Sequence, residues 1–396
     1  MINENMRVLG AHRSVIRELF EYGKKRKAEI GEDKVFDFSL GNPSVCAPAS
    51  VGNELIRLLS NEDPVSLHGY TSAQGDASVR ASVAKYINAT YGESVNADCL
   101  YMTVGAAGAL TAALTAIACP GEEVIVPAPY FPEYKVFVER TGASLIAVPS
   151  IKGSFMPDID AIENAITDRC AAVMINSPNN PTGAVYGEDV IIALANMLKR
   201  KSQELGKTIY LISDEPYREL VYGNANVPFI TKYYDDSIVC YSFSKSLSLP
   251  GERIGYLLLC PRCKEFTSVY QAICGAGRAL GFVCAPSLLQ KIIPSCLGDT
   301  ADISVYDENR KILSESLTDY GYEIVKPEGA FYLFIKSPSG NAEEFSERAK
   351  KYEILIVPGS DFGCSDYCRL SYCVQTDKIR DALPSMKLLL ESYKKK

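Results

Sequence analysis

The sequence predicts an α/β fold with a large domain, in which helices sandwich a mostly parallel central sheet, and a smaller α+β domain. Short apolar segments bounded by Gly, Pro, Asn or Asp are typical of buried strands. Six of them cover residues 122–129, 143–150, 171–178, 207–215, 236–244 and 253–260. Apolar residues at helical spacing over 187–205 separate two of these segments. Buried strands that alternate with helices indicate a parallel sheet covered on both faces.

The chain is long enough for more than one domain, with 396 residues of which 47% are hydrophobic. After about residue 295 the pattern changes to a helix followed by alternating strands. We therefore expect an N-terminal arm over residues 1–50 that joins the small domain, a large ligand-binding domain over 51–295, and a small C-terminal α+β domain over 296–396.

Composition excludes several function classes. The net charge is −7 and the basic residues are scattered, so we expect a small-molecule ligand and no nucleic acid. No apolar run is long enough to cross a bilayer, so we expect no membrane partner. The N-terminus lacks a signal-peptide core, and the thirteen cysteines are irregularly spaced, which together favour a reduced, cytoplasmic protein. Two histidines offer little to a metal site, and none is expected.

Polar residues follow the predicted strands at the points where they end. The carboxyl ends of parallel strands meet at one edge of a sheet, where ligands bind. An Ala-rich helix that begins at about residue 105 could add backbone N–H groups that bind a phosphate there. The residues expected at this edge are Gly105, Ala106, Ala107, Asn180, Asp214, Tyr217, Ser242, Ser244, Lys245 and Arg253.

The combination of these residue types points to pyridoxal phosphate, although each residue alone has an ordinary structural explanation. A buried lysine such as Lys245 is partly deprotonated and can form a Schiff base with an aldehyde. A carboxylate such as Asp214 can keep a pyridine nitrogen protonated, which makes the ring an electron sink. Arg253 and the two serines can neutralise a phosphate, while Asn180 and Tyr217 can hydrogen-bond a ring hydroxyl.

The chain resembles the class I/II aminotransferases of the fold-type I pyridoxal phosphate architecture, through the motifs "NSPNNPTG", "DEPY", "SFSKSLSLPGERIGY" and "YCRLS". The resemblance covers nearly the whole chain. It implies that Lys245 binds the cofactor aldehyde and later moves a proton between the substrate Cα and the cofactor, and that Asp214 pairs with the pyridine nitrogen. It further implies ring-oxygen contacts from Asn180 and Tyr217, and phosphate contacts from Ser242, Ser244, Arg253 and the Gly105–Ala107 turn.

Further segments extend the resemblance beyond the sheet. "HGYTSAQG" implies that Tyr70 reaches the phosphate of a neighbouring subunit, and hence a homodimer with shared active sites. "PAPYFPEY" implies that Phe131 stacks on the pyridine ring, and "FSLGNP" places Gly41 near the substrate carboxylate. "YCRLSYC" supplies Arg369, whose planar fork suits a bidentate grip on an α-carboxylate. Cys46 and Glu252 depart from the family pattern and could mark a subgroup.

The resemblance implies a transaminase that moves an amino group from an L-amino acid to a 2-oxo acid, with aspartate as the first donor to try. A C–S β-lyase of the same fold would share Lys245, Asp214 and Arg369, and the motifs barely separate the two activities. The acyl-transferring synthases are disfavoured because "SFSK" lacks the histidine of their lysine motif. A non-catalytic effector sensor is also disfavoured, since the lysine is retained and the residues before Gly41 are too few for a DNA-binding module.

Overall fold

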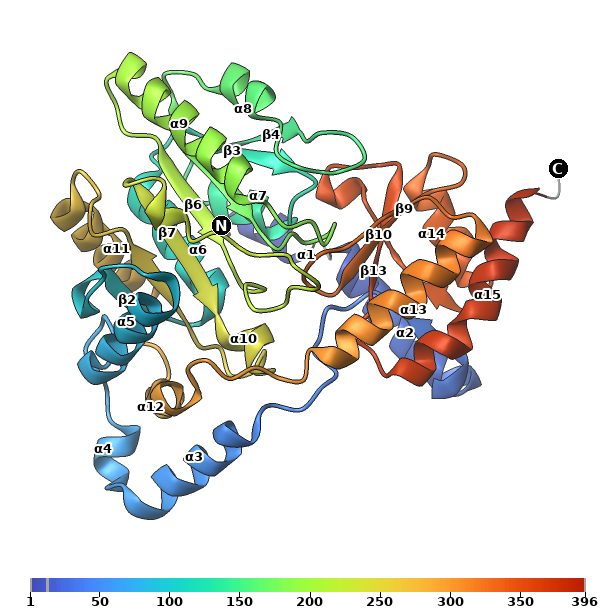
Figure 1. Ribbon diagram of the computed structural model, residues 1–396, viewed down its shortest axis with the longest axis horizontal. Helices are drawn as coiled ribbons and strands as arrows, with labels where there is room; N and C mark the ends of the chain where they lie inside the picture. Colours follow the sequence, from blue (N-terminus) through green and yellow to red (C-terminus); the bar gives the residue numbers. More distant parts are fainter. Residues whose placement is uncertain (1, 12–13, 395–396) are drawn as a thin grey trace.

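The computed structural model describes residues 2–11 and 14–394 of the chain. Figure 1 shows a larger body around one twisted sheet and a smaller body that holds the C-terminal strands and helices. The predicted fold class is confirmed, because the structure is α/β with a mostly parallel central sheet between helices.

The central sheet has seven strands among the described residues, and every neighbouring pair is parallel except the two that involve β8. All six predicted strands are present in it. In spatial order the strands are β2 (Leu100–Thr103), β8 (Gly255–Leu259), β7 (Ser237–Ser242), β6 (Tyr210–Asp214), β5 (Cys170–Asn176), β3 (Glu123–Ala128) and β4 (Ser144–Pro149).

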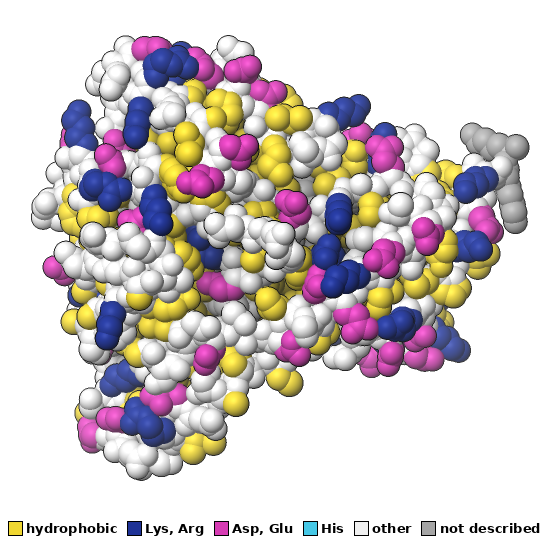
Figure 2. Space-filling model, in the orientation of Figure 1, with side chains coloured by type: hydrophobic (Ala, Val, Ile, Leu, Met, Phe, Trp, Pro, Cys, Tyr) yellow, Lys and Arg dark blue, Asp and Glu magenta, His cyan; other side chains and the backbone are white. Residues whose placement is uncertain are grey.

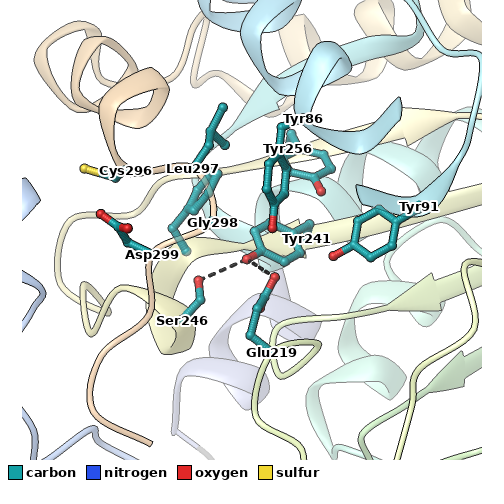
Figure 3. A pocket seen from close by; sticks show the side chains of 11 residues that line it. Tyr86, Tyr91, Glu219, Tyr241, Ser246, Tyr256, Cys296, Leu297, Gly298 and Asp299 are labelled. Atoms are coloured by element: carbon teal, nitrogen blue, oxygen red, sulfur yellow. Dashed lines mark hydrogen bonds between the residues drawn. The ribbon is translucent and has the colours of Figure 1, made fainter. Parts of the chain in front are cut away.

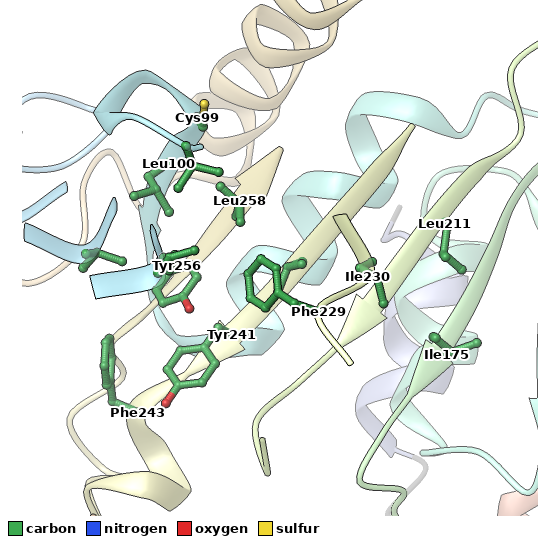
Figure 4. Packing of buried hydrophobic residues seen from close by; sticks show 14 of the residues in the cluster. Cys99, Leu100, Ile175, Leu211, Phe229, Ile230, Tyr241, Phe243, Tyr256 and Leu258 are labelled. Atoms are coloured by element: carbon green, nitrogen blue, oxygen red, sulfur yellow. The ribbon is translucent and has the colours of Figure 1, made fainter. Parts of the chain in front are cut away.

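Alternating side chains of the strands enter two separate cores, one on each face of the sheet. In β5, Val173 and Ile175 lie in one core while Ala172 and Met174 lie in the other. This alternation follows from the two-residue period of a strand. Figure 4 shows part of the first core, where Tyr241, Phe243 and Tyr256 pack together. Because both faces are covered, the strands read as continuous apolar runs in the sequence.

Each core is closed by its own set of helices. The core that contains Ile175 is covered by α3 (Ala49–Asn61), α5 (Ala77–Tyr91), α8 (Ile159–Ala165), α9 (Glu188–Leu205) and α12 (Ser287–Cys296). The opposite core is covered by α6 (Gly105–Ile117), α7 (Glu133–Glu139) and α11 (Phe266–Leu280). The short helices α4 (Pro64–His68) and α10 (Phe243–Ser246) lie in connections, and α10 carries the predicted site lysine.

The smaller body is built on an antiparallel four-stranded sheet. Its strands, in spatial order, are β12 (Val357–Pro358), β13 (Tyr367–Ser371), β10 (Tyr332–Lys336) and β9 (Ile324–Val325). Helices α13 (Ser304–Tyr320), α14 (Ala342–Lys350) and α15 (Thr376–Lys394) complete the smaller body. Short 3-10 helices occur in several parts of the chain, at Glu32–Lys34, Ala97–Cys99, Ile230–Lys232 and Ser360–Phe362. A third core, with Phe331, Leu333 and Phe345 among its members, holds these elements together.

The N-terminal segment contacts the smaller body. Helix α1 (Glu4–Ala11) buries no residue, but α2 (Val15–Ile30) contacts β12. The strand β1 (Phe36–Asp37) pairs in parallel with β11 (Ile354–Leu355). Arg26 Nε donates a 3.0 Å hydrogen bond to Glu353. These contacts are those expected of an arm, while the exact division at residues 50 and 295 stays a prediction.

Charged side chains of both signs are interspersed over the face shown in Figure 2. Among the helices in residues 2–11 and 14–394, none combines the length and the apolar character that a membrane span requires.

Helix α11 offers a matched pair of glycines that tests the packing of the core. A Cβ on Gly277 would lie 2.0 Å from the hydroxyl oxygen of Tyr101, which is fully buried in β2, whereas a Cβ on Gly275 would meet no atom within 4 Å. Gly277→Ala should therefore lower the free energy of unfolding by about 1–3 kcal/mol through overpacking. Gly275→Ala should raise it by up to about 1 kcal/mol, because alanine favours the helix. Urea denaturation of both variants measures the difference, and equal effects would contradict the packing described here.

Candidate active site

A cavity of about 360 Å³ lies where the carboxyl ends of β5, β6 and β7 meet the smaller body. Twelve of the fourteen predicted site residues line it, and only Gly105 and Tyr70 are not part of its wall. The twelve residues are Gly41, Ala106, Ala107, Phe131, Asn180, Asp214, Tyr217, Ser242, Ser244, Lys245, Arg253 and Arg369.

Parallel pairing of the three strands brings these residues together. Asn176 at the end of β5 is the register partner of Asp214 at the end of β6, and β7 runs parallel beside β6. The side chain of Asn176 donates to the backbone carbonyl of Asp214 at 2.8 Å and accepts from the backbone N–H of Asn180 at 2.7 Å. Asn176 thus ties two predicted site residues to one another. Its position at a strand end could have identified it from the sequence.

Lys245 lies in α10, directly after β7, and is half-buried in the cavity wall. Burial lowers its pKa to about 8, and the nearby charges of Arg253 and Arg369 act in the same direction. Its Nζ donates a 2.9 Å hydrogen bond to the carbonyl oxygen of Gly41. An amine with a pKa near 8 is neutral in roughly a tenth of molecules at pH 7, far more often than an ordinary lysine, and nucleophilic attack requires the neutral form.

Asp214 is buried, and one of its carboxylate oxygens has a partner while the other has none. Oδ2 accepts a 2.5 Å hydrogen bond from the hydroxyl of Tyr134, whereas Oδ1 is buried without a partner among the described residues. Burial raises the pKa of Asp214 to about 7, against the opposing effect of the Tyr134 hydrogen bond. A buried carboxylate oxygen without a donor is costly. Tyr134, three residues after Phe131 in the chain, carried no sequence signal for this contact.

Asn180, Tyr217 and Tyr332 form a polar group beside the strand ends. The hydroxyl groups of Tyr217 and Tyr332 lie 2.9 Å apart, and both rings are buried. Burial raises the pKa of both tyrosines, that of Tyr332 to about 12, so each keeps its proton at neutral pH. Tyr332 was not among the predicted site residues, because nothing in its local sequence distinguishes it from a core aromatic residue.

The first turn of α6 and the loop after β7 face the cavity together. The backbone N–H groups of Ala106 and Ala107 lie in this first turn, where a helix leaves them without intrahelical partners. Ser242 Oγ donates to Ser244 Oγ at 2.7 Å, and Arg253 Nη1 donates to the carbonyl of Pro250 at 2.8 Å.

Gly105 supports this turn without lining the cavity. Its φ of +78° is a conformation that glycine adopts readily, and a Cβ there would lie 2.9 Å from Arg253 Nη2. Arg253 itself has a φ of +53°, so the backbone holds the guanidinium in place at some conformational cost.

Arg369 in β13 is buried at the opposite side of the cavity, with 2% of its surface exposed. Its Nη1 donates to Asn180 Oδ1 at 3.0 Å and its Nη2 donates to the carbonyl of Ser39 at 2.6 Å, while Nε has no partner among the described residues. A buried guanidinium with an unused donor favours an anionic ligand. Gly41 lies nearby, and a Cβ on it would stand 2.1 Å from the Tyr332 hydroxyl oxygen.

The remaining two predicted residues, Phe131 and Tyr70, differ in their relation to the cavity. Phe131 lines the cavity and packs edge-on against Tyr134, with ring centroids 5.7 Å apart. Tyr70 is 93% exposed in the single chain and does not contribute to the cavity wall.

A second cavity lies beside the first core, but it is too small for a substrate. Figure 3 shows Tyr241 between Glu219 and Ser246, with its hydroxyl donating to Glu219 at 2.8 Å and lying 3.0 Å from Ser246 Oγ. The volume of about 20 Å³ accommodates roughly one water molecule. This cavity therefore does not compete as an active site.

The larger cavity fits the expected cofactor in several independent respects. Asp214 Oδ1 is a free acceptor for a protonated ring nitrogen, and Lys245 has the lowered pKa that attachment to an aldehyde needs. The N-terminus of α6, with Ser242, Ser244 and Arg253, offers donors to a phosphate group.

Comparisons with known proteins show the family of the chain. The family model described as aminotransferase class I and II matches residues 33–385. The chain is 30% identical to an aspartate aminotransferase of Thermotoga maritima, with 95% of this chain and 97% of the relative covered.

Two solved structures show the same architecture. An amino transferase from Eubacterium rectale is 51% identical, with a TM-score of 0.98 and 100% of each chain covered. The aspartate aminotransferase from Thermus thermophilus with maleate is 26% identical, with a TM-score of 0.86 and coverage of 98% of this chain and 100% of that chain. The chain therefore belongs to the aminotransferase class I and II family and is a pyridoxal-phosphate-dependent aminotransferase that acts on amino and oxo acids.

Proposed function

We propose that this cavity transfers the amino group of an L-amino acid to a 2-oxo acid, with Lys245 as the proton-transfer residue and Arg369 as the carboxylate receptor. The observation that carries the proposal is the pairing, across one cavity, of a lysine of lowered pKa with a buried aspartate whose Oδ1 has no partner among the described residues. Few other chemistries require both groups in one site.

Each residue has a defined task in this proposal. Pyridoxal phosphate, when bound, supplies an aldehyde for the amino group and a ring that withdraws electrons from Cα. Asp214 would hold a proton on the ring nitrogen, and Lys245 Nζ would carry a proton from the substrate Cα to the cofactor in the first half-reaction and from the cofactor to Cα in the second. Arg369 binds the α-carboxylate, which orients the Cα–H bond toward Lys245.

The remaining contacts hold the cofactor in this arrangement. Asn180 and Tyr217 would hydrogen-bond the ring oxygen, and Phe131 would stack on the ring. The phosphate is held by the backbone of Ala106 and Ala107 and by Ser242, Ser244 and Arg253, while Gly105 shapes the turn.

Aspartate is the proposed first donor because relatives from Thermotoga maritima and Pyrococcus horikoshii carry the name aspartate aminotransferase. A C–S β-lyase would use the same Lys245, Asp214 and Arg369. Eight curated relatives are named aminotransferases, which favours transamination.

A homodimer with shared active sites is part of the proposal. Large apolar side chains are exposed along α3, α4 and the following loop, including Ile56 at 67%, Val65 at 81% and Tyr70 at 93%. Burying such side chains against a second copy is favourable. In that assembly Tyr70 would reach the phosphate of the partner. We further propose a cytoplasmic location, since all thirteen cysteines are free thiols.

A single-turnover experiment tests the reaction. Adding aspartate and other amino acids to the cofactor-loaded protein, without an oxo acid, should convert the visible absorbance band stoichiometrically and release one equivalent of oxo acid. A 2-oxo acid should reverse the change, and Lys245→Ala should show neither event. Continuous release of pyruvate and ammonia from a cysteine-type substrate would instead identify a lyase, and no spectral change with any amino acid would reject the proposed function.

Substitution of Arg369 separates substrate binding from cofactor binding. Arg369→Lys keeps the charge but loses the planar fork, so KM for every amino donor should rise about 10- to 100-fold. The visible absorbance should stay near that of the wild type, because Arg369 does not hold the cofactor. Arg310→Lys is a matched control, since Arg310 also lies against a tyrosine ring, that of Tyr222, but outside the cavity. Steady-state kinetics measure KM in both variants. An unchanged KM in Arg369→Lys would show that another residue binds the substrate carboxylate.

The raised pKa of Asp214 predicts a pH-dependent cost in the apoprotein. An aspartate with a pKa of about 7 when folded and about 4 when unfolded makes the folded state bind more protons between these values, so stability falls as pH rises through this window. Asp214→Asn removes this cost. Without cofactor, the free energy of unfolding of the variant relative to that of the wild type should increase as the pH rises from 5 to 8, by roughly 3 kcal/mol at most.

Thermal unfolding of both apoproteins across this pH range measures the effect. The same variant should lose cofactor affinity, because its amide no longer supplies a negative charge to the ring nitrogen. A stability difference that is independent of pH would show that Asp214 does not titrate in this range.

A further inference from the structure

Tyr332 is a cavity residue to which neither the sequence motifs nor the family resemblance assigns a role. It is the first residue of β10, it is buried with 3% of its surface exposed, and it lines the cavity with both its hydroxyl group and its ring close to proposed site residues. Three separate contacts define its position.

The first contact is the 2.9 Å hydrogen bond between the Tyr332 and Tyr217 hydroxyl groups. A tyrosine hydroxyl has one proton to donate. If Tyr217 donates that proton to the ring oxygen of the cofactor, the hydrogen bond between the two tyrosines must run from Tyr332 to Tyr217. Donation to the Tyr217 oxygen polarises its O–H bond and makes Tyr217 a stronger donor.

The second contact is between the Tyr332 ring and the guanidinium of Arg369. Arg369 Cζ lies 4.6 Å from the ring centroid, within the range of a cation–π interaction. The register of the sheet explains the contact, because Arg369 in β13 is opposite Phe334 and therefore diagonal to Tyr332 on the neighbouring strand. The ring thus supports one side of the guanidinium while Asn180 and Ser39 accept from its edge.

The third contact is with Gly41. A Cβ at this position would lie 2.1 Å from the Tyr332 hydroxyl oxygen and 3.0 Å from its Cζ, so only glycine admits the hydroxyl group where it stands. The same glycine accepts the hydrogen bond from Lys245 through its carbonyl oxygen. The position of the Tyr332 hydroxyl group is therefore defined from two sides.

We propose that Tyr332 is a positioning residue that connects the two halves of the site: its hydroxyl group orients Tyr217 toward the cofactor ring oxygen, and its ring holds Arg369 in place for the substrate carboxylate. This inference rests on the proposed function, because it assigns Tyr217 and Arg369 the tasks given there. Tyr332 begins β10 of the four-stranded sheet and Tyr217 follows β6 of the central sheet, so the hydrogen bond also links segments of the two sheets at the site.

Three variants of the full-length, cofactor-loaded protein separate the two roles. Tyr332→Phe removes the hydroxyl group and keeps the ring, while Tyr332→Leu removes both. Tyr322→Phe is the matched control, because it deletes an equally buried hydroxyl group whose 2.8 Å hydrogen bond, to the carbonyl of Met386, lies away from the cavity. The readouts are the pH midpoint of the visible absorbance band and the KM and kcat of the half-reaction.

The hydroxyl group should act on the spectrum. The midpoint is the pH at which the cofactor-loaded site loses a proton and its visible band changes. A weaker Tyr217 donor stabilises negative charge on the ring oxygen less well. The site then releases that proton less readily, so the midpoint rises. Tyr332→Phe should raise the midpoint by about half a pH unit and change KM less than about twofold. Tyr332→Leu should show the same rise and an increase in KM of about five- to tenfold. Tyr322→Phe should change neither quantity.

A double-mutant cycle with Gly41→Ala tests the geometry. Gly41→Ala should displace the Tyr332 hydroxyl group and raise the midpoint by a similar amount. In the Tyr332→Phe background the same substitution should add little, because the hydroxyl group is already absent. Additive effects would overturn the proposal, as would a wild-type midpoint in Tyr332→Phe or an unchanged KM in Tyr332→Leu. Absence of any absorbance band or half-reaction in the wild type would reject the proposed function, and with it this inference.

Discussion

Parallel pairing of β5, β6 and β7 is the constraint on which the site depends, because it delivers three loops to one edge of the sheet. Asn176 and Asp214 are register partners across β5 and β6, and Lys245 lies in the short helix α10 that directly follows β7. Separate apolar cores cover both faces of the sheet. Polar side chains can therefore meet at the strand ends, where they are partly shielded from solvent. A slip of one residue in the pairing of β6 would turn Asp214 toward the opposite face.

Burial gives these side chains their chemistry. The same desolvation that lowers the pKa of Lys245 to about 8 raises that of Asp214 to about 7, so burial shifts both groups toward their neutral forms. Asp214 Oδ1 and Arg369 Nε are buried without partners among the described residues. Such groups destabilise the folded chain on its own, and a cofactor with a cationic ring nitrogen and a substrate carboxylate would offset part of that cost.

The larger body supplies most of the cavity wall, and the smaller body and the N-terminal segment complete it. Arg369 and Tyr332 come from adjacent antiparallel strands, and the N-terminal segment supplies the carbonyls of Ser39 and Gly41 to Arg369 and Lys245. The N-terminal segment also pairs with the C-terminal part through β1 and β11. Residues from the beginning, middle and end of the chain therefore have to be in place before the cavity exists.

The sequence by itself determined the fold class, the six central strands and most of the residues that line the cavity. Apolar runs, turn residues and a set of short motifs are local features, and the ends of parallel strands meet by a general rule. Only the tertiary structure decided which additional residues join them. Tyr134 and Tyr332 look like ordinary aromatic residues of a helix and a strand, and their contacts with Asp214 and Tyr217 span 80 and 115 residues of sequence. Such long-range hydrogen bonds depend on how helices and sheets pack against each other, and no periodicity within either segment records that packing.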